Sequence, residues 1–497
     1  MAGGIWSSQN KFRPGAYINF ETEAATRISV GERGIATMPI ALNWGGEGSI
    51  IELTSNDLLS GKSLAKVGLV YTDAAALLLN LALQNCRVLK LFNTNSGGTK
   101  AQGVLGVVTN YILTSDEAIV EGKTYYTRSG EGTTESPFVY TEVETPIASG
   151  LPTYYEASTD ADFAVTAKHP GDFGNKIVVT ITASPNGYVV DTYANGYFVD
   201  SQEVANGTKL VSNDFVDFAS VSGDLSETTI VLLGGTNGDS TSDYLSVYFS
   251  RLLDTAWNTM AVPTNDVTIH LAVINFIKSM RDNEGKYVQA VLPNADTTSA
   301  DYEGIINSVN GVVLSNGTNV SVTDFVAWVA GATAGARNID SLTGKVVDDA
   351  VSIVNALNND QIVEGLQTGK FILSRNQNGS IKVEKDINSL HTFTAEKSYT
   401  FSKNRVIREI DEIGSTVENI WETTYLGKVS NNEDGRTLFK SSIIDYLSSL
   451  QTIGAISDFD SESVVVEAGD DVDSVLASIA VKPIDSMELL YMTVNID

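Results

Sequence analysis

Cysteine, histidine, basic charge and long apolar runs are all scarce in this chain of 497 residues. Its one cysteine, Cys86, excludes an internal disulfide framework and fits assembly in a reducing compartment. Cys86 lies in the apolar stretch LLLNLALQNCRVLKLF, so we expect a buried structural thiol. No apolar run reaches about 18 residues, and MAGGIWSSQNKF shows no basic segment followed by an apolar one. We therefore expect neither a membrane span nor a secretory leader.

Basic residues number 32 against 61 acidic ones, which gives a formal net charge of −29. This charge argues against a nucleic-acid partner and favours a solvated, self-repelling surface. The length suggests about three domains, and 42% hydrophobic residues is ordinary for a globular chain. Eleven of the 32 basic residues lie between residues 370 and 440, the one region without an acidic excess.

The residue types that catalysis requires do not form a recognisable constellation. The three histidines, His169, His270 and His391, lack the spacing of a metal site and are interpreted as ordinary surface or packed side chains. No GxSxG nucleophile elbow is present. The stretch SNNEDGRT at residues 430–437 lacks the glutamate of a calcium loop and is interpreted as a hairpin turn. We expect no enzyme activity, no cofactor and no metal.

Local patterns predict strands and helices in alternation. RGIATMPIALNWG is typical of a buried strand, and a helix is predicted to start at the cap Thr72 or Asp73, followed by a strand over residues 87–92. After residue 94, recurring Asn-Gly pairs between short β-rich runs predict a meander or sandwich. After residue 233 the α/β pattern resumes, and the capped helix in VSVTDFVAWVAGATAGA ends in small residues that permit close packing.

Both ends of the chain have strand-like sequences. PGAYINFE alternates after a Pro-Gly turn, and SMELLYMTVNID places Leu490, Met492, Val494 and Ile496 on one face of a strand. A strand with such a face must be covered. Either it joins its own sheet or another molecule takes it.

These patterns predict an α/β core, an inserted β-rich, sandwich-like domain, an α+β C-terminal domain and strand-forming extensions at both ends. The expected segments are an N-terminal extension (1–23), the first part of the core (24–93), the acidic β-rich insertion (94–232), the second part of the core (233–365), the C-terminal domain (366–486) and a C-terminal strand (487–497).

Nine segments, in order along essentially the whole chain, resemble the sheath proteins of contractile phage tails, of the myovirus and defective-prophage type. Any one segment is weak, but nine in register are specific. They are PGAYINFE, KHPGDFGNKIVVTI, LLGGTNG, DYEGIINSVNGV, WVAGATAGARNIDSLT, VEKDINSLHTFT, FSKNRVIREIDEI, GRTLFKSSIIDYLSSLQ and VKPIDSMELLYMTVNI. The resemblance implies a core that is subtilisin-like in shape and non-catalytic, because the serine, histidine and aspartate of a protease are not evident.

The resemblance also implies that both terminal strands leave their own subunit and add to a small sheet in a neighbour. The strand residues carried over are Ala16, Tyr17, Ile18, Asn19, Phe20, Glu21, Leu489, Leu490, Tyr491, Met492, Thr493, Val494, Asn495 and Ile496.

The implied partners are further copies in stacked hexameric rings, an inner tail tube, baseplate proteins and a tail terminator, with no membrane contact by the sheath itself. The implied location is a virion or phage-tail-like particle, assembled in the host cytoplasm and released by lysis. Lys403, Arg405 and Arg408 are candidates to face the tube; a solvated helix face that bridges nearby acidic residues is an equal alternative.

Two other classes of protein fit part of the sequence. A β-rich cell-surface protein such as an S-layer or adhesin subunit fits the acidity but predicts a leader. A hydrolase with a subtilisin-like core fits the α/β blocks but predicts a catalytic triad.

Overall fold

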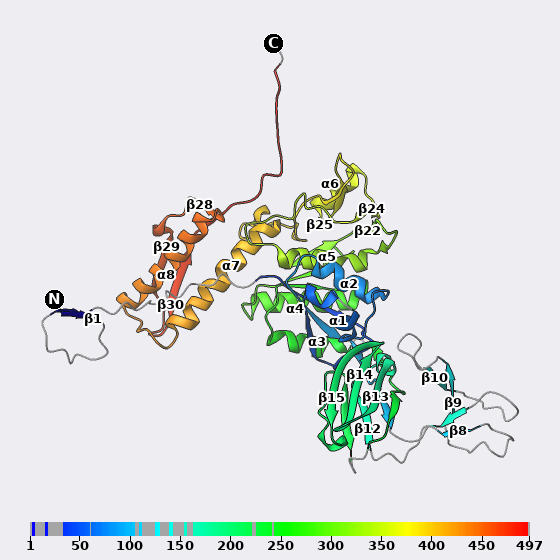
Figure 1. Cartoon of the computed structure of the whole chain (residues 1–497). Helices are drawn as coiled ribbons and strands as arrows, with labels where there is room; N and C mark the ends of the chain where they lie inside the picture. The colour runs from blue at the N-terminus through cyan, green and yellow to red at the C-terminus, as the bar shows by residue number, and fades with distance from the viewer. Residues whose placement is uncertain are drawn as a thin grey trace. The chain divides into compact units, whose positions relative to one another are not determined.

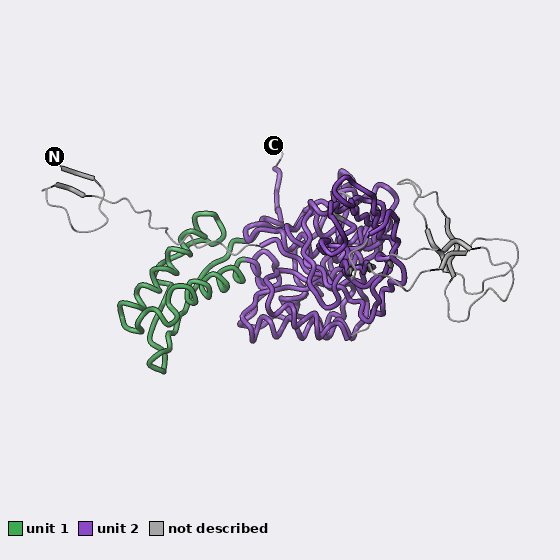
Figure 2. The backbone as a smooth tube through the Cα atoms, turned by 60° about the horizontal axis from the view of Figure 1, so that its bottom comes forward, with its two compact units in different colours: residues 1–32, 409–484 green, residues 33–408, 485–497 purple. Residues whose placement is uncertain are grey.

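The computed structural model describes residues 33–59, 61–104, 163–220, 225–240 and 243–495, and the backbone of a few short strands outside these ranges. The chain divides into two compact units (Figure 2). Unit 1 comprises residues 1–32 and 409–484, and unit 2 comprises residues 33–408 and 485–497. The chain therefore leaves unit 2 after Arg408, inside helix α7 (Asn404–Ile420), and returns to it at Asp485.

Unit 2 is built on a seven-stranded sheet (Figure 1). Its neighbouring strands run parallel, except that β4 runs antiparallel to β5. In spatial order the strands are β25 (Lys370–Phe371), β21 (Ile305–Ser308), β20 (Gln289–Pro293), β19 (Thr259–Ala261), β3 (Ile35–Ile40), β5 (Val88–Asn93) and β4 (Ile50–Leu53).

Helices cover both faces of this sheet. Side chains of α2 and α5 share one apolar core with Val291 of β20, whereas those of α3 and α4 share a second core with Ala290 and Leu292. The alternation along β20 places its side chains on opposite faces, both buried, as in parallel sheets generally. The helices of unit 2 are α1 (Gly61–Ala65), α2 (Ala74–Leu83), α3 (Tyr244–Leu253), α4 (Val267–Asp282), α5 (Val322–Gly335) and α6 (Asn359–Gln367).

The predicted start of α2 is confirmed, because Asp73 is its N-cap residue. The predicted cap and small residues of α5 are confirmed as well. Ser321 caps α5, and glycines let its last turns approach the end of α2. A Cβ on Gly331 would lie 2.2 Å from the carbonyl oxygen of Ala82, inside van der Waals contact.

Between β5 and α3 the chain forms the predicted β-rich insertion. Val165 and Val216 of one sheet share a core with Ile181 and Val190 of a second sheet, which makes this part a sandwich. The first sheet contains β7 (Lys100–Val104), β12 (Phe163–Pro170) and β16 (Val216–Ser220), and the second contains β13 (Ile177–Ser184), β14 (Gly187–Ala194), β15 (Tyr197–Val204) and β17 (Thr228–Val231).

The remaining strands outside unit 1's C-terminal part are short. They are β1 (Ala2–Gly4), β2 (Gly15–Tyr17), β6 (Asn95–Ser96), β8 (Thr109–Tyr111), β9 (Tyr125–Ser129), β10 (Val139–Glu142), β11 (Tyr154–Glu156), β18 (Asp239–Ser240), β22 (Gly311–Leu314), β23 (Asn319–Val320), β24 (Ala350–Val354), β26 (Leu373–Arg375) and β27 (Ile381–Val383).

Unit 1 is a helical pair with a small β part. Helix α7 continues into a π-helical turn (Trp421–Tyr425), and α8 (Glu433–Thr452) packs against β29. The interpretation of residues 430–437 as a hairpin turn is wrong, because they contain the N-cap and first turn of α8. The side chain of Asn432 accepts a hydrogen bond from the Gly435 amide there. The strands of unit 1 are β28 (Ile456–Ser457), β29 (Val464–Ala468), β30 (Val475–Ile479) and β31 (Lys482–Pro483).

The compact units do not divide where the composition suggested. The C-terminal domain was predicted to begin at residue 366, but residues 366–408 belong to unit 2, where β25 completes the central sheet. The strand β25 is two residues long and carries no sequence signal of its own.

We predict that Gly331→Ala lowers the free energy of unfolding by about 1–3 kcal/mol, because the added methyl group meets backbone that cannot move aside. Gly365→Ala in α6 is the matched control, since the one short contact of its Cβ would be with the terminal methyl group of Ile372, the far end of a flexible side chain. Urea unfolding measures both. An equal loss in the two variants would contradict close packing of α5 on α2.

Candidate functional site

The described residues contain no group of three or more histidine, cysteine, aspartate or glutamate side chains placed to hold a metal ion. The three histidines lie in separate packed environments. His169 packs edge-on against Trp44, His270 is hydrogen-bonded through Nε2 to a backbone carbonyl at 2.7 Å, and His391 lies 3.3 Å from the Asp301 carboxylate. Within the described ranges, no helix is long and apolar enough to cross a membrane.

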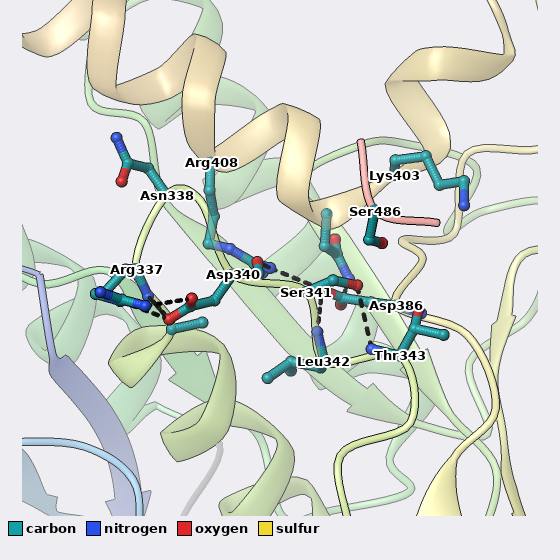
Figure 3. Close-up of polar contacts among 12 residues, drawn as sticks. Arg337, Asn338, Asp340, Ser341, Leu342, Thr343, Asp386, Lys403, Arg408 and Ser486 are labelled. Atoms are coloured by element: carbon teal, nitrogen blue, oxygen red, sulfur yellow. Dashed lines mark hydrogen bonds and ion pairs between the residues drawn. The ribbon is translucent and has the colours of Figure 1, made fainter. Parts of the chain in front are cut away.

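A buried polar network lies where α7 begins (Figure 3). Arg408, 1% exposed, donates from Nη2 to the Asp386 carboxylate and to the carbonyl oxygen of Asp340, each at 2.7 Å. The Asp386 carboxylate also accepts hydrogen bonds from the Leu342 amide and from Asn404 Nδ2, each at 2.9 Å. Three donors therefore satisfy this carboxylate, as a buried charge requires.

The network extends to the chain that returns from unit 1. Lys403 forms ion pairs with Glu488 and, at 3.3 Å, with Asp485. Thr343 Oγ1 donates to Glu488 at 2.7 Å and accepts from the Asp386 amide at 2.9 Å, so one hydroxyl joins both halves of the network. We call Thr343, Lys403, Asp485 and Glu488 the tail anchor.

Lys403 stays charged inside this site. Burial alone would lower the pKa of its ammonium group, but the hydrogen bond that Lys403 donates to Glu488 and the charges of Glu488 and Asp485 outweigh burial and raise that pKa above its ordinary value. The ammonium group is therefore a permanent partner for the two carboxylates at neutral pH.

Residues 489–495, which we call the tail, run from the anchor as an extended trace without strand pairing (Figures 1 and 2). Their large apolar side chains are between 69% and 90% exposed. Such a series costs free energy in water unless something covers it. Those side chains are Leu489, Leu490, Tyr491, Met492 and Val494.

Unit 1 carries an uncovered surface of its own. Strands β29 and β30 form a two-stranded hairpin that pairs with no other described strand. Leu476 on β30 is 62% exposed, and the β29–β30 turn borders a groove of about 390 Å³ lined by Trp421, Tyr425 and Phe439. An isolated two-stranded hairpin is marginally stable and leaves free backbone donors and acceptors along its edges.

The structure separates the candidate tube-facing residues. Lys403 and Arg408 are buried and paired inside unit 2, so neither side chain presents its charge at the subunit surface. Lys403 pairs with Asp485 and Glu488, and Arg408 pairs with Asp386. Only Arg405 is half-exposed. The hypothesis of a tube contact is therefore confined to Arg405 and stays a prediction.

The predicted terminal strands are described only in part. Ala16 and Tyr17 lie in β2, which pairs in parallel with β1, whereas Ile18, Asn19, Phe20 and Glu21 lie outside the described residues. At the other end Leu489 to Asn495 are described and Ile496 is not. The tail anchor escaped prediction, because its members are up to 145 residues apart in the sequence.

The exposed tail and the open β29–β30 hairpin suit contacts with other copies, as in a structural subunit of an assembly. Three family profiles match in order: the tail sheath protein Gp18 domain III N-terminal region (33–93), the phage tail sheath protein central domain (236–389) and the phage tail sheath C-terminal domain (396–497).

Among solved structures, the sheath tail protein of Desulfitobacterium hafniense is 34% identical, with a TM-score of 0.71 over 95% of this chain and 98% of that one. The phage-like element PBSX protein XkdK of Bacillus subtilis is 30% identical over the full length of both chains. The anti-feeding prophage helical sheath in its contracted state is 12% identical with a TM-score of 0.53, a likeness of fold alone.

The chain belongs to the phage tail sheath proteins. It is a structural subunit of a contractile tail sheath, not an enzyme, and its place is a virion or phage-tail-like particle.

We predict that Arg408→Ala lowers the free energy of unfolding by about 3–5 kcal/mol, because it leaves the Asp386 carboxylate buried without its counter-charge. Arg337→Ala is the control: its ion pair with Asp340 is exposed to solvent, so its melting temperature should match that of the unaltered chain. Equal melting temperatures for the two variants would show that the buried pair does not stabilise unit 2.

We also predict a pH dependence that His270 carries. Burial lowers its pKa below the ordinary value, so the unfolded chain binds a proton more readily than the folded chain does. The free energy of unfolding should therefore fall as the pH drops below about 6.5. His270→Gln keeps a side-chain N–H for the Thr264 carbonyl and should show a flatter melting profile between pH 7 and pH 5; parallel profiles would contradict this.

Proposed function

We propose that copies of this chain stack as hexameric rings in a helix around an inner tail tube, and that the tail of each copy adds a strand to the β29–β30 hairpin of a neighbour. The observation that carries the proposal is the coexistence, on one chain, of an uncovered apolar tail and an open hairpin. Each surface needs a partner, and a second copy supplies both.

The β30 edge is the better acceptor of the two edges of this hairpin. Strand β29 packs against α8, whereas Leu476, Ala477 and Ser478 of β30 are exposed. The register of the hairpin, with hydrogen bonds from Ala480 to Ser463 and from Gly469 to Ser474, directs the Ala477 amide away from β29. An added strand would find free backbone donors there, and its alternate side chains would reach the apolar groove.

Contraction in this proposal is a change between two packings of the same subunit. The sheath assembles in an extended, metastable state, a baseplate signal releases one end, and subunits reorient cooperatively into a shorter, wider state. Donated strands keep neighbours joined while the subunits turn. The energy is stored at assembly, so no nucleotide is needed.

The finer features that the sequence resemblance implies belong to the same proposal. They are a core of subtilisin-like shape, a donated N-terminal strand that includes Ala16 and Tyr17, contacts with a baseplate and a tail terminator, and a tube contact through Arg405. Assembly in the host cytoplasm and release by lysis complete it. The tube that emerges would then be driven through the envelope of a target cell.

We predict that the unaltered chain forms striated hollow tubes, seen by negative-stain electron microscopy, and that a chain lacking residues 489–497 gives dispersed, folded particles. Ala477→Pro should also stop tube formation, because proline removes the outward amide of β30. Ala477→Val keeps that amide and is the control.

Tubes from the truncated chain would overturn donation of the tail. Tubes from Ala477→Pro, with none from the truncated chain, would show that the tail binds elsewhere on the neighbour.

A further inference from the structure

The tail changes abruptly from anchored to free at Glu488. The side chain of Glu488 is 10% exposed, whereas those of Met487 and Leu489 on either side project fully or largely into solvent. The Glu488 carboxylate is held by Lys403 and by the Thr343 hydroxyl, and both of these side chains come from the α/β part of unit 2. A single side chain therefore fixes the root of an otherwise exposed segment.

The anchor also stands at two of the three points where the chain passes between the two units. The chain leaves unit 2 after Arg408 and returns at Asp485. Arg408 is tied to Asp386, and Asp485 is tied to Lys403. Thr343 accepts a hydrogen bond from the Asp386 amide and donates one to Glu488, so one network fastens the unit 2 side of these two crossings.

We infer that the tail anchor, through Lys403, Thr343 and Glu488, directs tension on a donated tail into the α/β core of unit 2 and keeps it out of unit 1. This inference rests on the proposed donation of the tail. Without the anchor, a pull on residues 489–495 would travel along the backbone through Asp485 to Ile484. There it would reach the last contacts of unit 1, the β28–β31 pair and the hydrogen bond from the Ile484 amide to the Ala455 carbonyl.

The chemistry of the anchor suits this role. Backbone hydrogen bonds of a two-residue strand pair such as β28–β31 can open one at a time under tension. Withdrawal of Glu488 instead separates an ion pair whose lysine side chain is 7% exposed, so Lys403 would lose its closest counter-charge inside the protein. The anchor therefore resists a pull on the tail better than the backbone hydrogen bonds of the β28–β31 pair do.

Unit 1 is also the part that receives a strand from a neighbour in the proposed sheath. With the anchor in place, the tail that a copy donates is held by its unit 2, and the tail that it accepts is held by its unit 1. The two links of one copy then act on separate compact units, and the 408–409 and 484–485 crossings carry no tension from the donated tail.

Hydrogen exchange at Ile484 tests the inference. Full-length Glu488→Ala is compared with the unaltered chain, each as free subunits and as contracted sheaths. We expect the Ile484 amide to exchange at least tenfold faster in Glu488→Ala sheaths than in free Glu488→Ala subunits, and at the same rate in both forms of the unaltered chain. A merely structural role would accelerate exchange in free subunits as well.

Lys382→Met is the control, because its ion pair with Glu384 at 3.5 Å lies outside the tail anchor, so exchange at Ile484 should match that of the unaltered chain. If Glu488→Ala does not fold, Glu488→Gln removes the ion pair and keeps an acceptor for Thr343. Equal protection of Ile484 in variant and unaltered sheaths would overturn the anchor. Failure of the proposed tail donation is seen separately, as tubes formed by the chain that lacks residues 489–497.

Discussion

The polar network at the start of α7 depends on the ion pair between Arg408 and Asp386. Asp386 receives the guanidinium, holds the Leu342 amide and, through its own amide, positions Thr343 for Glu488. These residues come from four separate places in the sequence, namely 342–343, 386, 408 and 488. Because Leu342, Asp386 and Arg408 are buried, water cannot replace their partners without a cost in free energy, which makes the geometry specific as well as stable.

The two units offer different physical properties to a sheath. Unit 2 has a parallel sheet with apolar cores on both faces, and such a double-sided core resists deformation. Unit 1 is smaller and exposes a hairpin edge. Unit 2 carries a tail that it can donate, and unit 1 carries a strand edge that can accept one. Subunits with both features could turn relative to their neighbours and stay joined to them. The anchor adds the condition that the strand is fixed at its root.

Sequence patterns predicted the elements whose signals are local. Asp73 and Ser321 each precede an apolar helix, and Gly331 lies among small residues, so the starts and the close packing of these helices were readable. The interpretation of residues 430–437 as a hairpin turn was wrong because helix N-caps and turns favour the same residue types, such as Asn432. Only the helix that follows distinguishes the two.

The burial of Lys403 and Arg408 could not be predicted from local sequence patterns. Lys403 and Arg408 look like surface charges in an amphipathic helix, and their burial depends on Asp386 and on Glu488, the latter 85 residues from Lys403. Alternation at the C-terminal end predicted a strand whose apolar face needs cover, but it left open whether the chain's own sheet or another molecule supplies that cover.

The charge of −29 limits how such copies hold together. Like-charged surfaces repel, but at physiological salt this repulsion fades beyond roughly 8 Å, so cohesion must come from short-range contacts. Burial of a large apolar side chain gains roughly 1.5–3 kcal/mol, whereas ordering a residue costs roughly 1–2 kcal/mol. The five large side chains of the tail therefore gain little more than its seven residues cost.

One tail alone is thus a weak link, and free subunits would keep it in solvent, as the structure shows. In the proposed sheath, a ring would place every tail beside an acceptor at high effective concentration, which would turn many weak links into a stable assembly. Fixing Glu488 shortens the segment that must be ordered on binding, because the tail starts from a defined point. The same ion pair that receives the tension would then also favour formation of the link.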